Sequence, residues 1–407
     1  MENIILRNFK PIGFHPMPKF SKGDLSIDQN GNISAVEMVG KIEAVDSARE
    51  INLDGCYLSP GWIDLHTHVY YGVGDIGIRP TEVGPGTGTV MLVDAGSSGE
   101  SNFEGFREHI VNKNKFPIRS LINISTLGMP DGTASHLSEL MGWESINLNR
   151  LLTVCNNNRS IIKGIKLRAS KHILRDLGME AVNIAVNAAE LCKLPLFVHI
   201  GEPPAFLSDL VEILRPGDII THSFNGKIGN NVVYNKNLLK IYQKGIDRGI
   251  RFDIGHGSSS FSFAAARMLI SSNVLPFSIS TDIHALNLNG PVYDLATTMS
   301  KMMAVGMNLQ QVIDCVTANP AQFLQQKEWT KLEVGQKAFL TGFKLRQGKF
   351  TLTDSNSLGD GPVVMNSYES TNVDSIIDPI IAFYGDNYCK SESRFLKLNK
   401  NYISTIK

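Results

Sequence analysis

Two histidines separated by one residue stand in the stretch "GWIDLHTHVYYG", which runs from Gly61 to Gly72. Imidazole is the commonest metal ligand among side chains. Residues i and i+2 of a strand point to the same side, so His66 and His68 would share one face. A His-x-His pair alone is a weak sign of a metal. It becomes a strong sign only where further ligands converge on the same place.

Further polar side chains occur at the ends of later apolar runs. They are Lys166 and Arg168 in "IIKGIKLRA", His199 in "LPLFVHIGE", His222 in "DIITHSF", His256 in "IRFDIGHG" and Asp282 in "PFSISTDIH". Imidazole nitrogen and carboxylate oxygen suit divalent metals such as zinc. Polar groups that converge in an apolar interior are costly to bury unless they bind something.

The elements that would bring these residues together are eight apolar runs between residues 58 and 328, most of them followed by a segment with helical spacing. The first three are "GWIDLHTH", "GTVMLVDAG" and "IRSLINIS". Alternation of this kind predicts parallel βαβ units, and eight of them fit an α/β fold of the (β/α)8 (TIM) barrel type. Catalytic groups of such barrels lie at the C-terminal ends of the strands, where the polar residues stand. A doubly wound open sheet is the alternative, but no GxGxxG turn follows a strand.

The two ends of the chain have a different sequence pattern, in which short runs of β-forming residues are separated by turn signals such as Asn-Gly and Asp-Gly. We expect residues 1–57 and 329–407 to pair as one small β-sandwich domain beside the barrel of residues 58–328. The last forty residues match no segment that we can place. We expect this tail to affect the small domain and not the metal site.

The composition is that of an ordinary globular enzyme. The 407 residues are 43% hydrophobic and 19% charged, with a formal net charge of zero, which gives no reason to expect a nucleic-acid or membrane partner. The start of the chain does not read as a signal peptide, and no apolar stretch approaches the roughly 18–20 residues of a membrane span. The five cysteines form no CxxC pair. We therefore expect a cytoplasmic protein with free thiols.

Three positions allow more than one interpretation. Arg168 could aim its guanidinium at a substrate carboxylate or could belong to a structural ion pair. His256 could contact substrate or support the ligands, or it could simply bond to a loop. Lys163 is an alternative to Lys166, but its odd offset puts it on the opposite strand face.

With these residues assembled, the sequence resembles the amidohydrolase superfamily of metal-dependent hydrolases. The segments "PGWIDLHTH", "GIKLRAS", "FVHIGE", "THSFNG" and "STDIH" resemble its five metal-site segments in the expected order. Within it, "GTVMLVDAGSSG", "FDIGHGSSSFSF" and "YDLATTMSKMMAVGM" resemble a dihydroorotase-related deacetylase subfamily. The tail departs from the family pattern, since "GQKAFLTGF" replaces the expected "ADL" strand.

The resemblance implies two divalent metal ions, with zinc preferred. It places His66, His68 and Asp282 on one ion and His199 and His222 on the other. It implies that Lys166 bridges the two ions as a carboxylate derived from carbon dioxide. A water molecule between the ions would be the nucleophile, and Asp282 would act as general acid and base.

The function implied is hydrolysis of a carbon–nitrogen amide bond, or of an ester, in a small molecule, with a deacetylase preferred. Cyclic amidohydrolysis of the dihydroorotase type, adenine-type deamination and a non-catalytic scaffold are the alternatives, in that order. Arg168 would suit a substrate that carries a carboxylate. A homo-oligomer is compatible with the sequence.

Overall fold

The computed structural model describes residues 2–43, 48–132, 137–357 and 367–399. Seven parallel strands form one sheet in the order β12-β11-β10-β9-β8-β7-β6. Their bounds are β6 Trp62–Thr67, β7 Thr89–Ala95, β8 Ile118–Asn123, β9 Ile162–Ala169, β10 Leu196–Ile200, β11 Ile219–Thr221 and β12 Arg251–Phe252. These are the first seven predicted runs, and their buried apolar residues explain why they form the interior of the molecule.

The eighth run closes the barrel without forming a regular strand. It joins its two neighbours through the parallel bridges Asp253↔Ser278 and Thr67↔Ile283. Asp282 donates its backbone N–H to the carbonyl of His66 at 2.7 Å, which ties this segment to the first strand. The predicted (β/α)8 barrel is therefore present, with an irregular eighth element.

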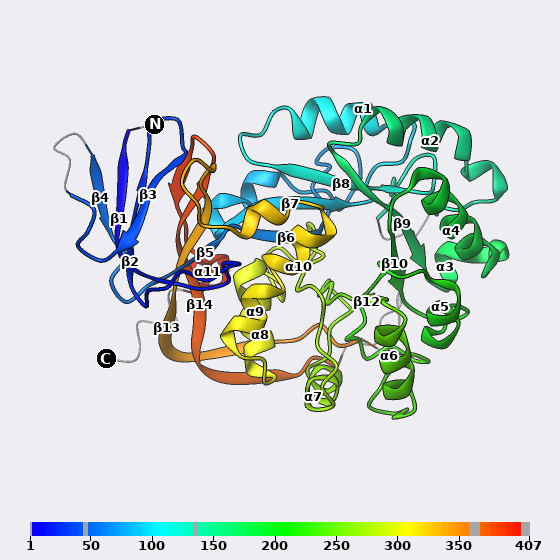
Figure 1. Ribbon diagram of the computed structural model, residues 1–407. Helices are drawn as coiled ribbons and strands as arrows, with labels where there is room; N and C mark the ends of the chain where they lie inside the picture. The colour runs from blue at the N-terminus through cyan, green and yellow to red at the C-terminus, as the bar shows by residue number, and fades with distance from the viewer. Residues whose placement is uncertain (1, 44–47, 133–136, 358–366, 400–407) are drawn as a thin grey trace.

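Helices surround the strands of the barrel (Figure 1). The α-helices are α1 Phe103–Phe106, α2 Leu148–Asn157, α3 Lys171–Leu174, α4 Glu180–Cys192, α5 Leu207–Ile213, α6 Leu238–Asp247, α7 Phe263–Ser271, α8 Leu295–Ala304, α9 Leu309–Asp314, α10 Ala318–Phe323 and α11 Arg394–Leu398. The 3-10 turns are η1 Pro80–Glu82, η2 Pro85–Thr87, η4 Trp143–Ser145, η5 Arg175–Leu177 and η6 Lys327–Thr330, and η3 Arg107–Val111 is a π-helical turn that continues α1. Among the described residues, no helix has the length and apolar character needed to cross a membrane.

The two ends of the chain share a second sheet beside the barrel (Figure 1). Its strands are β1 Ile4–Pro11, β2 Gly23–Ile27, β3 Ile33–Met38, β4 Arg49–Asn52, β5 Tyr57–Pro60, β13 Phe339–Thr353, β14 Ser370–Tyr384 and β15 Tyr388–Lys390. The order is β15-β14-β13-β5-β1-β2-β3, and β4 pairs with β1. The antiparallel pairing of β13 with β5 joins the C-terminal segment to the N-terminal one.

The hairpin of β13 and β14 is long enough to leave the small domain and run along the barrel. Figure 1 shows its strands passing below α8 and α9 toward α7. Ile377 on β14 donates its N–H to the hydroxyl of Ser300 on α8 at 2.9 Å. Beyond β13, Ser355 and Phe261 exchange bonds, with the N–H of Ser355 donating to the carbonyl of Phe261. The hairpin therefore contacts the loop that follows β12.

Candidate metal centre

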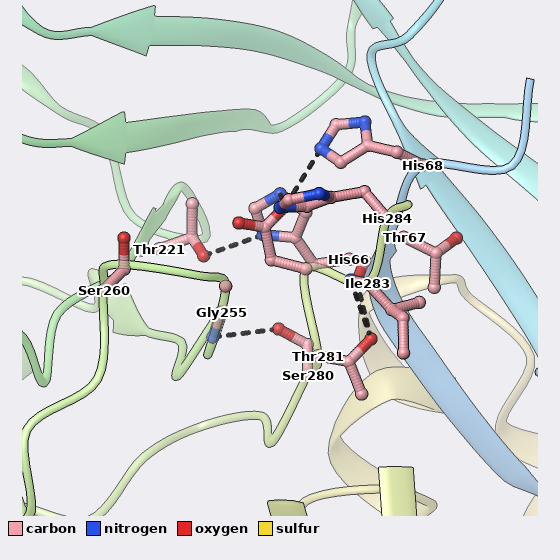
Figure 2. Close-up of polar contacts among 12 residues, drawn as sticks. His66, Thr67, His68, Thr221, Gly255, Ser260, Ser280, Thr281, Ile283 and His284 are labelled. Atoms are coloured by element: carbon pink, nitrogen blue, oxygen red, sulfur yellow. Dashed lines mark hydrogen bonds and ion pairs between the residues drawn. The ribbon is translucent and has the colours of Figure 1, made fainter. Parts of the chain in front are cut away.

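The two histidines of the first barrel strand meet at a single carboxylate oxygen. Nε2 of His66 lies 3.2 Å from Oδ1 of Asp282, and Nε2 of His68 lies 3.0 Å from the same oxygen. Every residue of β6 is buried, and His68, which follows directly after β6, is buried as well, so both rings lie inside the barrel. In Figure 2, His66 stands between Thr221 and His68.

The other predicted ligands gather around this pair. Nζ of Lys166 lies 3.2 Å from Nε2 of His66, and Nε2 of His222 lies 3.9 Å from Oδ2 of Asp282. The ring centroids of His199 and His222 are 4.3 Å apart. Potential ligand atoms of His66, His222 and Asp282 all lie within 4.8 Å of one another. The structure thus brings all six predicted ligands to one place, and their role as ligands remains a prediction.

Two of these residues have a strained backbone. His222 has a φ of 65° and Asp282 a φ of 49°, which lie in the left-handed region that residues other than glycine seldom adopt. Such conformations persist where surrounding contacts enforce them, and they cluster at functional sites. Gly257 is one such contact. A Cβ built on Gly257 would lie 2.5 Å from Oδ2 of Asp282, so only glycine fits there.

Burial lowers the pKa of three basic side chains of the cluster. It lowers the pKa of His66 well below its usual value and the pKa of His222 to about 3. It also lowers the pKa of Lys166 to about 7. Burial alone would raise the pKa of Asp282, but the neighbouring histidines hold it well below the usual range. His66 and His222 are therefore neutral nitrogen bases beside the carboxylate of Asp282.

The donor set fits a divalent cation. Nδ1 of His222 lies 2.6 Å from the carbonyl oxygen of Gly255, which can only accept, so Nδ1 carries the proton. Nε2 of His222 then presents a lone pair, and this buried atom has no hydrogen-bond partner among the described residues. A cation bound between Nε2 of His222 and the carboxylate of Asp282 would accept this lone pair and so satisfy the buried atom.

Arg168 belongs to a buried ion pair. Its Nη1 lies 2.6 Å from Oε1 of Glu139 and 3.1 Å from the carbonyl oxygen of Gly132. The side chain of Glu139 is 1% exposed and that of Arg168 is 11% exposed. Arg168 therefore takes part in a structural ion pair, which was one of its two interpretations. Its contact with a substrate carboxylate remains a prediction.

His256 is completely buried and bonded at both ring nitrogens. Nζ of Lys301 lies 2.8 Å from Nε2, and the carbonyl of Gly257 lies 2.9 Å from Nδ1. Its predicted contact with substrate remains untested. The hydroxyl of Ser355 also donates to the carbonyl of His256, at 3.0 Å. Ser355 follows β13 and precedes the last forty residues, so the segment after β13 reaches from the small domain into the barrel at His256.

The sequence analysis missed His284, which follows Asp282 by two residues. Nδ1 of His284 accepts the N–H of Leu286 at 3.3 Å, so the ring proton lies on Nε2. Its ring centroid is 6.4 Å from that of His68. Burial lowers its pKa to about 4. The offset of two residues from a ligand, in "STDIH", was the signal that could have found it.

The chain is similar to proteins named deacetylases. It is 41% identical over 353 residues to Deacetylase Atu3266 from Agrobacterium fabrum, covering 87% of this chain and 86% of that protein. It is also 41% identical over 354 residues to a deacetylase from Brucella anthropi, covering 87% of each. A deacetylase from Enterococcus faecalis is 34% identical over 317 residues, with 77% of this chain and 84% of that protein covered. No family model matches the chain.

Solved structures of other amidohydrolases are similar to this chain. A crystal structure of a dihydroorotase superposes with a TM-score of 0.88 at 38% identity, covering 97% of this chain and 100% of that one. A crystal structure of an adenine deaminase gives 0.83 at 29% identity, covering 95% and 99%. A D-hydantoinase at 15% identity, with a TM-score of 0.64 and coverage of 96% and 95%, shares the fold. The chain therefore belongs to the amidohydrolase superfamily, in its dihydroorotase-related deacetylase group, and is an enzyme that hydrolyses carbon–nitrogen bonds other than peptide bonds.

Proposed function

We propose that this chain is a deacetylase, which removes an acyl group from a small amide or ester at a centre of two divalent metal ions. The observation that carries the proposal is the cluster in which His66 and His68 turn Nε2 toward one oxygen of Asp282. Relatives named deacetylases, at 41% identity, support acyl removal over ring opening or deamination.

The residues divide between the two ions as follows in this proposal. His66, His68 and Asp282 hold one ion, His199 and His222 hold the other, and Lys166 bridges them. Nitrogen ligands completed by oxygen suit zinc. A lysine ammonium has no lone pair and a neutral amine has only one, so Lys166 can bridge two ions only in the carboxylated form. Its neutral amine would attack carbon dioxide, forming an N–C bond and a carbamate with release of one proton.

The environment of Lys166 supports this modification. Its side chain is almost completely buried, and burial lowers the pKa of the amine to about 7, so the reactive neutral form is accessible near neutrality. The carbamate would carry a negative charge into a site that otherwise holds one carboxylate, Asp282. That second negative charge would offset part of the positive charge of two divalent cations.

Bound metal ions would acidify a water molecule and polarise the acyl carbonyl. Asp282 would accept the proton of the attacking water as the water oxygen bonds to the carbonyl carbon, and it would do so through Oδ2, because Oδ1 faces the two histidines. When the tetrahedral carbon collapses, the carbon–nitrogen or carbon–oxygen bond breaks. Asp282 then returns the proton to the leaving nitrogen or oxygen. The products are the free acid and the amine or alcohol.

The test is release of acetate from a panel of N-acetyl and O-acetyl amino acids and hydroxy acids, with dihydroorotate and adenine assayed beside them. The protein is stripped with a chelator and reloaded with zinc. We expect acetate release that disappears after stripping and returns with zinc. Turnover of dihydroorotate or adenine, with none of the acetyl compounds hydrolysed, would contradict the proposal.

A further inference from the structure

The buried carboxylate of Asp253 lies behind the predicted metal site. It accepts hydrogen bonds from residues that in turn contact two of the predicted histidine ligands. Asp253 follows β12 and has no exposed surface. Its Oδ2 accepts the hydroxyl of Thr221 at 2.6 Å and the hydroxyl of Ser280 at 2.7 Å. Its Oδ1 accepts the hydroxyl of Ser278 at 2.5 Å. The three donors come from the two parts of the barrel that flank β12, namely β11 and the eighth segment.

The first connection leads to His66. Oγ1 of Thr221 lies 3.0 Å from Nδ1 of His66 (Figure 2). A hydroxyl has one proton, and a carboxylate only accepts, so Thr221 donates to Asp253 and must accept from Nδ1. The proton of the His66 ring is thereby held on Nδ1, and the lone pair is left on Nε2, the atom that faces the predicted metal.

The second connection leads to His222. The N–H of Gly255 donates to Oγ of Ser280 at 3.1 Å (Figure 2), so the proton of Ser280 goes on to Asp253. This holds the peptide of Gly255, whose carbonyl accepts Nδ1–H of His222 at 2.6 Å. Ser280 and Gly255 therefore fix the ring of His222 as Thr221 fixes the ring of His66.

We propose that Asp253 is a positioning residue for one ligand of each metal ion. Through Thr221 it holds the ring of His66 in the tautomer that leaves Nε2 free to bind a metal. Through Ser280 and Gly255 it holds the ring of His222 in the same tautomer. The inference rests on the proposed metal site. Partners of this kind behind a ligand typically change metal affinity by 10- to 100-fold when they are removed.

The experiment measures the two stepwise dissociation constants for zinc, by competition with a chromophoric chelator, in single variants of the full chain. We expect Asp253→Ala to weaken both steps about 10- to 100-fold. Thr221→Val should weaken one step and Ser280→Ala the other. Adding Thr221→Val to Asp253→Ala should cost little more, because both changes break one chain of bonds.

Two variants separate positioning from general damage. Asp253→Asn keeps an oxygen toward Thr221 and Ser280 while its amide faces Ser278, so it should retain most of the wild-type affinity. Asp218→Asn changes a buried carboxylate at the opposite end of β11, where it accepts the N–H of Leu196 at 2.8 Å, and should leave both constants unchanged. Equal affinities for wild type and Asp253→Ala, or Asp253→Asn as weak as Asp253→Ala, would overturn the proposal.

A second readout needs no metal. Nitrogen-15 NMR of labelled histidine reports which ring nitrogen is protonated, and in the stripped protein we expect His66 in the Nδ1–H form. Thr221→Val, which keeps the shape of the side chain, should shift His66 toward the other tautomer. An unchanged tautomer would contradict the inference. If wild type binds no zinc, the proposed function fails, and the same spectrum recorded on Asp253→Ala still tests Asp253, because the tautomer of His66 should shift there too.

Discussion

Nζ of Lys301 lies 2.8 Å from Nε2 of His256, and both side chains are completely buried. Nζ also lies 2.7 Å from the carbonyl oxygen of Pro291, so the amine donates to both atoms. Nδ1 of His256 must then carry the ring proton, which it can donate to the carbonyl of Gly257. The bond between Lys301 and His256 thus anchors the turn whose two glycines contact His222 and Asp282.

The first prediction concerns the pH dependence of stability set by Lys301. Burial lowers its pKa to about 7, against about 10.4 for a free lysine. Between these values the unfolded chain binds more protons than the folded one, so the lysine's contribution to stability rises with pH. We expect the free energy of unfolding of wild type, relative to Lys301→Met, to rise from pH 7 to pH 10, by up to about 1.4 kcal/mol per unit.

Urea unfolding at several pH values measures this difference. Lys240→Met on the exposed face of α6 is the matched control and should show no such trend. A difference between wild type and Lys301→Met that stays flat, or falls, as the pH increases would show that Lys301 is not held with a lowered pKa.

The second prediction separates strain from contact at the glycine beside Asp282. Gly257 has a φ of 56° and Gly178 a φ of 53°, but a Cβ on Gly178 would meet nothing within 4 Å. Alanine at either position should cost about 1–3 kcal/mol of unfolding free energy through backbone strain. Only Gly257→Ala should also displace Asp282 and weaken zinc binding. Urea unfolding measures the loss of stability in each variant, and zinc titration measures the metal affinity. Equal zinc affinities in the two variants would refute the contact between residue 257 and Asp282.

The third prediction concerns the ion pair of Arg168 and Glu139. Glu139→Gln would leave a buried guanidinium without its charged partner, so we expect a loss of about 3–5 kcal/mol in unfolding free energy. Glu212→Gln breaks the exposed contact with Lys244 and should change it by less than about 1 kcal/mol. Chemical denaturation of the two variants compares them. A loss below 1 kcal/mol in Glu139→Gln would mean that the ion pair of Arg168 and Glu139 does not stabilise the fold.

The six predicted ligands were identifiable from sequence because each ends an apolar run, and a barrel brings the ends of its strands together. The eighth run shows the limit of that reasoning. "SISTD" reads as a strand, yet the hydroxyls of Ser278 and Ser280 bond to Asp253, and the segment pairs only through isolated bridges. Periodicity reports which face is apolar and does not report where a hydroxyl bonds.

The supports of the ligands were not predictable for a related reason. Asp253 and Lys301 are buried charges whose partners are far away in the sequence, and a single chain gives no sign of such pairs. Lys301 lies in a segment that reads only as a helix, and Ser355 lies in a tail that reads only as strands. Their contacts with His256 depend on the length of β13 and the position of α8, which are set by tertiary packing.

The most direct test of the central claim is the metal content per chain, measured by elemental analysis on wild type and on Lys166→Ala purified in the same way. We expect close to two ions per wild-type chain and a clear decrease in the variant, because in the proposed centre the carboxylated lysine bridges both ions. One ion per chain, unchanged by the substitution, would contradict the lysine-bridged centre.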